Sequence, residues 1–152
     1  QQIYADKAEI FMSISRTNPM PFAKEVLTAL QAAGKKIVLV TGSGQKSLIS
    51  RLNESYPGVF SPENMVTSFD VKYGKPNPEP YLMALQKAGV RPNEAVVIEN
   101  APLGVQAGVE AEIFTIALNT GILNDDVLSS AGANVVLPSM QTLYDHLSSL
   151  LR

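Results

Sequence analysis

Polar residues from three separate segments of the chain have the types and spacing needed to bind and neutralise a phosphate group. Thr41 follows an apolar run, Lys75 stands between a glycine and a proline, and Glu99 and Asn100 end a second apolar run. A hydroxyl at a strand-to-helix turn binds anions, an ammonium group neutralises phosphoryl charge, and carboxylate and amide oxygens are ligands for Mg²⁺. The three segments therefore predict phosphoryl chemistry if the fold brings them together.

The first segment, Thr41-Gly-Ser-Gly44, joins the apolar run Ile37-Val-Leu-Val40 to a predicted helix. Free backbone N–H groups and the positive end of the helix dipole favour an anion at such a turn. We predict that Thr41, Gly42 and Ser43 bind phosphate. An ordinary turn, in which Ser43 or the glycine after it caps the helix, explains these residues alone equally well.

The second segment places Lys75 in a loop that three prolines stiffen, Tyr73-Gly-Lys-Pro-Asn-Pro-Glu-Pro80. A lysine held in this way can reach a phosphoryl group as a point charge on a long stem. Taken alone, Lys75 is more readily explained as a solvated surface residue. His146 lies in the last predicted helix without a partner motif, and we expect it at the surface.

The third segment places Glu99 and Asn100 after the run Ala95-Val-Val-Ile98, which we predict to be a strand buried on both faces of a parallel sheet. Ligands bind outside the carboxyl ends of such strands. A carboxylate at that position must be paired, hydrated or bound to a metal. For Asn100, capping the helix that begins near Ala101-Pro102 is an equally weighted alternative.

Short strands that alternate with helices must position these residues. The apolar runs predict strands, and the periodic segments between them predict helices. The strands are expected at 37–40, 65–67, 95–98, 113–117 and 134–137, and the helices at 1–16, 22–33, 45–55, 81–88, 104–110, 125–131 and 141–151. This alternation predicts an α/β fold with a parallel sheet and helices on both faces.

Composition excludes several classes of protein. The 152 residues and 45% apolar content suit one domain, and a net charge of −2 without a basic run argues against nucleic-acid binding. The absence of cysteine excludes a disulfide framework and agrees with a cytoplasmic protein. No apolar run approaches the roughly 20 residues of a membrane span. A dinucleotide fingerprint fits poorly, because Ser47 stands where the third glycine is required.

Three motifs in order carry a family resemblance: Val-Leu-Val-Thr-Gly-Ser at 38–43, Gly-Lys-Pro-Asn-Pro at 74–78, and Val-Val-Ile-Glu-Asn-Ala-Pro-Leu-Gly-Val-Gln-Ala-Gly at 96–108. They closely resemble the haloacid dehalogenase superfamily of phosphohydrolases and phosphomutases. The resemblance is strongest to the β-phosphoglucomutase branch, which includes relatives that hydrolyse pyrophosphate. It covers the chain from about Met20 to its end. It implies a Rossmannoid three-layer sandwich.

The resemblance also implies a role for each candidate residue. Thr41 would hydrogen-bond the transferring phosphoryl group, and Lys75 would bridge that group and the nucleophile. Glu99 and Asn100 would hold Mg²⁺. Asn100 stands where the family usually has an aspartate, so we expect weak or negligible Mg²⁺ affinity in this chain.

The chain departs from the family where the nucleophile is expected. The family carries an Asp-x-Asp motif at the end of its first strand, at the sheet's centre, and this chain has no such strand; Asp6 lies in a helical pattern. We expect that residues 1–17 are a remnant of a cap-domain helix and linker. Residues 18–152 would be an incomplete core, the carboxyl-terminal part of a longer enzyme.

The expected function of the longer protein is Mg²⁺-dependent phosphoryl transfer with an upstream aspartate as nucleophile, the 152-residue chain alone being inactive. The first choice is a phosphatase acting on a small phosphorylated metabolite or pyrophosphate, and the second is a sugar-phosphate mutase. The alternative of another class is a non-catalytic interaction domain on the same scaffold. An unfilled sheet centre would also expose strand edges able to pair with another chain.

Overall fold

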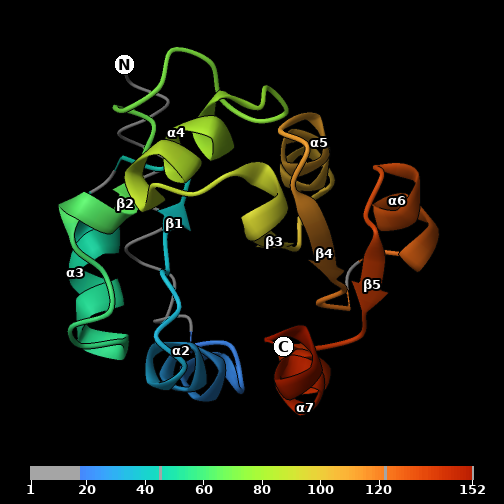
Figure 1. Cartoon of the computed structure of the whole chain (residues 1–152), viewed down its shortest axis with the longest axis horizontal. Coiled ribbons are helices and arrows are strands. Elements are labelled where there is room, and N and C mark those ends of the chain that lie inside the picture. The colour runs from blue at the N-terminus through green and yellow to red at the C-terminus, as the bar shows by residue number, and fades with distance from the viewer. Residues whose placement is uncertain (1–17, 45, 122, 152) are drawn as a thin grey trace.

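The computed structural model describes residues 18–44, 46–121 and 123–151, in which strands and helices alternate (Figure 1). The strands are short and all of their pairings are parallel. The elements are α2 (Ala23–Ala32), β1 (Leu39–Val40), α3 (Lys46–Ser55), η1 (Pro62–Asn64), β2 (Met65–Val66), α4 (Glu79–Ala88), η2 (Pro92–Glu94), β3 (Val96–Glu99), α5 (Pro102–Glu110), β4 (Phe114–Leu118), α6 (Asp125–Ser130), β5 (Val135–Leu137) and α7 (Met140–Leu150). The expected α/β alternation is confirmed.

The larger sheet has the order β3-β4-β5, with β4 in the middle. Its register pairs Ile98 with Ile116 and Ile116 with Val135, so these three side chains share one face of the sheet. Val97, Thr115 and Ala117 belong to the opposite face by the same alternation. Because β4 is covered on both faces, its residues from Thr115 to Leu118 are buried.

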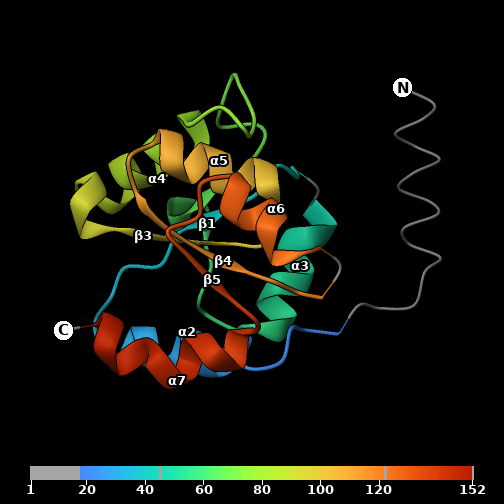
Figure 2. The same cartoon turned by 90° about the vertical axis from the view of Figure 1, so that its right-hand side faces the viewer.

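Helices cover both faces of this sheet, with α4, α5 and α6 on one side and α2 and α7 on the other (Figure 2). On the first side, Val97 packs in one apolar cluster with Tyr81 and Leu85 of α4. On the second side, Ile116 packs with Val26 of α2 and with residues of α7. The expected three-layer arrangement is therefore confirmed.

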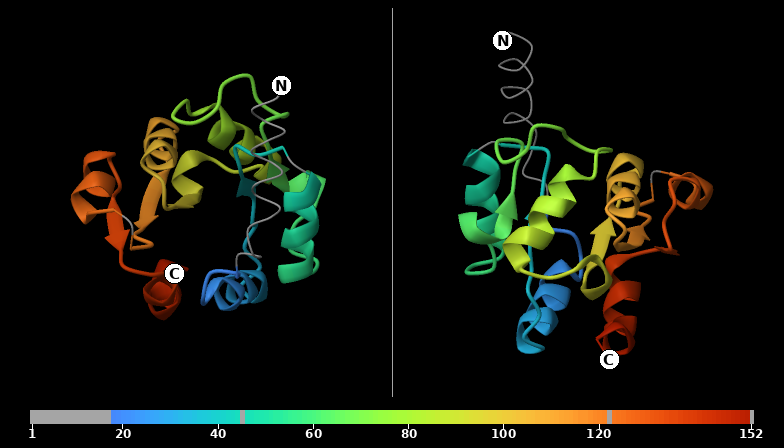
Figure 3. Two further views of the ribbon diagram at one scale, coloured as in Figure 1. Left: turned by 180° about the vertical axis from the view of Figure 1, so that it is seen from behind. Right: turned by 45° about the horizontal axis from the view of Figure 1, so that its top comes forward.

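The smaller sheet consists of β1 and β2 alone, paired through Leu39 with Met65 and Val40 with Val66. Within the described part of the chain, β1 and β3 form no strand pairing with each other, and Figure 3 shows the two sheets standing apart above α2 and α7. The helix α4 contacts both strands of the smaller sheet and also α5. Thr41 and Glu99 therefore lie at the ends of strands that belong to two separate sheets.

The structure corrects the prediction that the strand before Glu99 is buried on both faces. Val96 is 49% exposed and Ile98 is 39% exposed, whereas Val97 between them is buried. The physical reason is that β3 is an edge strand in this structure, and α2 and α7 cover the sheet nearer to β4. The predicted helix at 1–16 lies outside the described residues, and so does its assignment to a cap domain.

Candidate functional site

The turn after β1 places the Thr41 hydroxyl at the carboxyl end of the smaller sheet. The Thr41 backbone N–H donates to the Val66 carbonyl at 2.9 Å and so extends the β1–β2 pairing by one residue. The Ser43 N–H donates to Thr41 Oγ1 at 3.2 Å, which turns the chain sharply away from the strand. A side chain on Gly42 would meet no atom within 4 Å, so the backbone of this turn is open to a ligand.

Gly44, the other glycine of the turn, lies close to another side chain. A Cβ atom on Gly44 would lie 2.2 Å from the ring of Phe69, whose side chain is 84% exposed. The turn and the loop that follows β2 are therefore in close contact at this point. Helix α3 is described from Lys46 onward, so the alternative that Ser43 or Gly44 caps this helix stays a prediction.

Lys75 connects the ends of the two sheets. Its ammonium group donates to the Val40 carbonyl, at the end of β1, over 3.3 Å. It also forms an ion pair with Oε1 of Glu99, at the end of β3. Its Nζ lies 5.0 Å from the centre of the Tyr81 ring, a distance suited to a cation–π interaction. Lys75 is therefore not a freely solvated surface residue, which was the alternative for this lysine taken alone.

Glu99 accepts a hydrogen bond at each of its available positions. Oε1 receives the Lys75 ammonium and the Tyr81 hydroxyl, the latter at 3.0 Å. Oε2 receives the backbone N–H groups of Asn100 at 2.8 Å and Ala101 at 3.1 Å. Because a carboxylate has about four acceptor positions, this set of partners satisfies it completely.

The surroundings of Glu99 stabilise its charged form. Burial acts to raise the pKa of the carboxyl, but the hydrogen bond and charge of Lys75 and the N–H groups of Ala101 and Asn100 outweigh burial and lower it. The pKa of Tyr81 is raised, first by burial and then by the neighbouring Glu99 charge and hydrogen bond. Tyr81 therefore stays a neutral donor to an ionised Glu99.

Helix α5 approaches Glu99 very closely at Gly104, the third residue of the helix. A Cβ on Gly104 would lie 2.1 Å from the Glu99 carboxyl carbon and from Oε1. The N-cap of this helix is Ala101, which makes no side-chain cap hydrogen bond. The alternative that Asn100 caps the helix is therefore wrong, because the N-cap position belongs to Ala101. Glu99 receives the N–H groups of the two residues before the helix.

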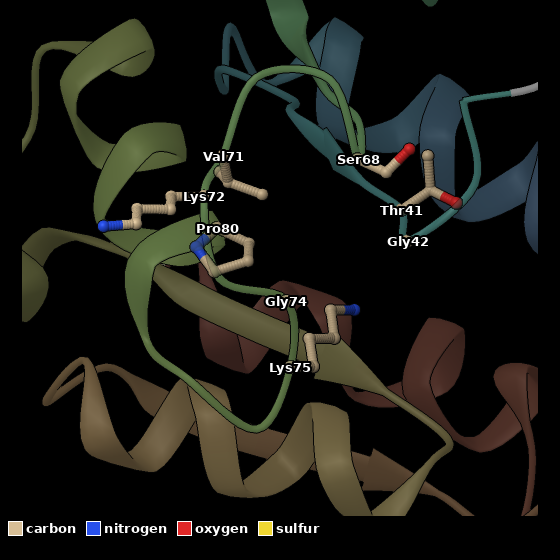
Figure 4. Close-up of a pocket in the computed structure, with 8 residues that line it drawn as sticks. All are labelled: Thr41, Gly42, Ser68, Val71, Lys72, Gly74, Lys75 and Pro80. Atoms are coloured by element: carbon tan, nitrogen blue, oxygen red, sulfur yellow. The ribbon is translucent and has the colours of Figure 1, made fainter.

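A pocket of about 270 Å³ lies between the turn after β1 and the loop after β2. Both Thr41 and Lys75 line it, and Figure 4 shows the Lys75 ammonium extending below Gly42 while the Lys72 ammonium points away. The lining residues come from these two segments and the start of α4; they are Thr41, Gly42, Ser68, Val71, Lys72, Gly74, Lys75 and Pro80. The fold thus brings together the turn, Lys75 and, through the ion pair, Glu99.

The residues present do not form a complete Mg²⁺ site. Glu99 already has its acceptor positions occupied by protein donors, and Asn100 is exposed and offers a neutral amide oxygen. Among residues 18–44, 46–121 and 123–151, no group of three or more His, Cys, Asp or Glu could hold a metal ion. Mg²⁺ prefers several oxygen ligands that include carboxylates, and this donor set falls short.

Sequence reasoning missed two residues of this site, Tyr81 and Gly104. Tyr81 follows the lysine loop directly, but its partner Glu99 lies 18 positions later, so no local pattern could identify the contact. Gly104 could have been singled out as a glycine inside a predicted helix, which usually marks a close approach. His146 is exposed, as expected, with its Nδ1 2.9 Å from the Thr142 carbonyl oxygen.

None of the helices within the described ranges is both long enough and apolar enough to span a membrane.

Comparison with protein families gives a match over most of the chain. The model for haloacid dehalogenase-like hydrolases matches residues 2–112. Hexitol phosphatase A of Escherichia coli is 38% identical over 100 residues, which are 66% of this chain and 45% of that protein. The phosphorylated carbohydrates phosphatase of Thermotoga maritima is 33% identical over 138 residues, 88% of this chain and 61% of that protein. This chain thus spans about half the length of these relatives.

Solved structures give the same match. A Bacteroides vulgatus protein provisionally named a beta-phosphoglucomutase is 55% identical with a TM-score of 0.92, over 98% of this chain and 60% of that chain. A hydrolase of the same superfamily from Deinococcus radiodurans, solved with bound phosphate and sodium, is 30% identical with a TM-score of 0.75. That match covers 86% of this chain and 59% of that chain.

Proposed function

Because this chain belongs to the haloacid dehalogenase-like hydrolase family, we propose that it forms the phosphoryl-binding part of a phosphatase acting on a small phosphorylated metabolite. The observation that carries the proposal is that Thr41 and Lys75, 34 positions apart (75 − 41), line one pocket at the strand ends. Ligands bind at this edge of open α/β sheets.

Two segments that line the pocket supply the proposed contacts to phosphate. The Thr41 hydroxyl and the open backbone at Gly42 bind the phosphoryl oxygens at the turn after β1, and the Ser43 N–H, which donates to Thr41 Oγ1, holds that hydroxyl in the turn. Lys75 neutralises the negative charge on those oxygens, which is the largest contribution that a protein makes to phosphoryl transfer. Glu99 acts here by holding the Lys75 ammonium beside the pocket, through the ion pair already described.

The nucleophile of the proposed reaction is an aspartate that the described residues do not supply. By the family resemblance it would stand at the end of a strand between β1 and β3, the two edges that face each other unpaired. Such a strand would bring its carboxylate next to Val40 and Glu99, where the Lys75 ammonium lies. Pairing of the same edges with a second copy of the chain would instead make an oligomer whose size depends on concentration.

Binding of Mg²⁺ would require carboxylates in addition to those of the described residues. Glu99 and Asn100 would hold Mg²⁺ only together with further carboxylates and only if Glu99 gave up one of its protein donors, and the metal would then supply charge stabilisation to the phosphoryl oxygens. We expect negligible Mg²⁺ affinity for this chain in the absence of phosphate. Titration calorimetry checks this, and tight binding would contradict it.

The names of the relatives support a small phosphorylated substrate. Both curated relatives described above are phosphatases, one of hexitol phosphates by its name and one of phosphorylated carbohydrates. A sugar phosphate is therefore our preferred substrate, and pyrophosphate is less favoured because neither name points to it. A cysteine-free chain suits the reducing cytoplasm, where we place this activity.

A sugar-phosphate mutase is the second candidate function. The observation in its favour is the 55% identity to the Bacteroides vulgatus protein, which carries a beta-phosphoglucomutase name. A mutase returns the phosphoryl group to a sugar, whereas a phosphatase transfers it to water. Product analysis of the whole protein with a sugar monophosphate distinguishes them, since only hydrolysis accumulates inorganic phosphate.

The experiment that tests the pocket is a titration of this chain with inorganic phosphate, followed by amide NMR signals of the turn after β1. The variant Lys75→Met should weaken binding about tenfold or more, the usual contribution of a charge-assisted hydrogen bond. Lys72→Met is the matched control, because Lys72 lines the same pocket but its ammonium points away (Figure 4). Equal binding by both variants would remove Lys75 from the mechanism and favour a non-catalytic interaction domain.

A further inference from the structure

The loop between β2 and α4 forms most of the pocket wall and carries Lys75. Residues 67–75 contain neither helix nor strand, so no regular hydrogen-bond ladder holds them in place. The loop must nevertheless be stiff, because the Lys75 ammonium has to reach Val40 and Glu99 at the ends of two different strands. The prolines that follow Lys75 stiffen one side of it, so the segment before Lys75 is the part that needs a contact from outside the loop.

Glu79, at the first position of α4, holds this backbone. Its Oε1 accepts the N–H of Lys72 at 2.9 Å, and its Oε2 accepts the N–H of Tyr73 at 2.7 Å. One carboxylate thus binds two successive amides that lie two and three residues before Lys75. The Glu79 N–H donates to Asn77 Oδ1 at 2.9 Å, so the helix start and the loop form one connected unit.

A second carboxylate, that of Asp70, holds the beginning of the loop. Asp70 Oδ2 accepts the N–H and the hydroxyl of Thr67, both at 2.7 Å, which closes a tight turn. Its other oxygen lies 3.5 Å from Lys87, near the end of α4. Residues 67–70 are therefore anchored separately. The Asn77 N–H donates to the Gly74 carbonyl at 3.0 Å and closes a turn around Lys75, and Glu79 holds the segment that leads into this turn.

We propose that Glu79 is the positioning residue of Lys75, holding the Lys72 and Tyr73 amides so that the Lys75 ammonium stays at the pocket. This role rests on the proposed function of Lys75 in binding phosphoryl oxygens. An acidic residue in the first turn of a helix is also favourable for the helix itself. That local effect does not require both carboxylate oxygens to face loop amides, as they do here.

The test is the accessibility of the Lys75 amine to an acylating reagent, read site by site by mass spectrometry. In Glu79→Gln one of the two oxygens becomes an NH₂ group, which cannot accept an amide N–H. Lys75 labelling should then rise about fivefold, in proportion to the population in which the ammonium has left Glu99 and Val40. Lys36, whose Nζ donates to the Ala88 carbonyl away from the loop, is the internal reference.

Two further variants separate positioning from a general loss of structure. Glu94→Gln is the matched control, since Glu94 also accepts a backbone N–H, that of Arg91 at 2.8 Å, but lines no part of this pocket. Glu79→Asp keeps the charge on a shorter stem and should restore labelling part of the way to the native value. It also serves if the glutamine variant does not fold.

The outcomes decide the proposal. Selective labelling of Lys75 in Glu79→Gln, with Lys36 unchanged in that variant, supports the proposal. In the Glu94→Gln control the labelling of Lys75 should stay at the native value. Unchanged Lys75 labelling in folded Glu79→Gln overturns the proposal, and so does an equal rise at Lys75 and Lys36. Titration of the native chain with inorganic phosphate separates the two proposals: failure to bind would overturn the proposed function, while the labelling still decides the role of Glu79.

Discussion

The two sheets of this molecule are held in place by different kinds of interaction. The β3-β4-β5 sheet is covered on both faces, and the central strand β4 contributes Thr115 and Ala117, both fully buried. The β1-β2 sheet is only two residues long in each strand. It is joined to the rest of the chain by α4 and by polar contacts at the strand ends. Apolar burial contributes to both sheets, since Met65 and Val66 of β2 are buried too, but the smaller sheet is shorter and depends in addition on polar contacts at its strand ends.

The candidate site lies where these two regions meet. Lys75 contacts Val40 at the end of the smaller sheet and Glu99 at the end of the larger one. The site therefore depends on how the sheets are placed relative to each other, while the stability of the chain depends mainly on the larger sheet and its helices. Each of the following predictions tests this separation, beginning with the largest expected effect.

Truncation in the core of the larger sheet should have the largest effect. Leu143 of α7 is 1% exposed and packs with Ile116 and Leu118, so Leu143→Ala should lower the free energy of unfolding by about 2–5 kcal/mol. Val66→Ala in the smaller sheet removes less apolar surface and should cost about 2 kcal/mol. Urea denaturation measures both variants, and a larger loss for Val66→Ala would contradict the separation.

A methyl group added at Gly104 should disturb the contact between the sheets. The new Cβ would lie 2.1 Å from the Glu99 carboxyl, which must move away from Lys75. Overpacking of this kind costs about 1–3 kcal/mol, and we expect Lys75 labelling to rise as well. Gly42→Ala is the control, because its Cβ meets nothing within 4 Å. Native stability in Gly104→Ala would show that the carboxylate can move without cost.

The smallest effect is the pH dependence that Glu99 contributes to stability. Because the pKa of Glu99 is lowered in the folded chain, its stabilising contribution is complete above the ordinary glutamate value of 4.5. It is lost as the pH falls through the folded pKa, when the carboxyl takes up a proton. The native chain should therefore be more stable than Glu99→Gln at pH 7 by about 1–3 kcal/mol, and this difference should shrink on acidification.

Thermal unfolding of both proteins between pH 7 and pH 3 measures this difference. Tyr81→Phe is the useful comparison, because it removes one donor to Glu99 and keeps the ring beneath Lys75. It should lower stability less than Glu99→Gln does. A stability difference between the native chain and Glu99→Gln that stays constant with pH would mean that Glu99 is not the titrating group.

Local patterns in the sequence predicted the family and, within the described ranges, the order of the strands and α-helices. The predicted strand at 37–40 contains β1, the one at 95–98 overlaps β3, and the family resemblance seen in three ordered motifs is confirmed. The short helices η1 and η2 were not predicted. The roles of Thr41, Lys75, Glu99 and Asn100 stay predictions, although the fold brings the first three together. Helix starts, strand ends and stiff loops depend on residues that are adjacent in the sequence, so they could be predicted from the sequence alone.

Only the tertiary structure decided what Glu99 contacts and how much of its strand is covered. The hydrogen bonds to Lys75 and Tyr81 join positions 24 and 18 residues apart, so no local pattern could fix them. The exposure of Val96 and Ile98 depends on whether another strand and another helix lie beside them. An apolar run indicates that a strand can be buried. How far it is buried depends on which elements pack against it.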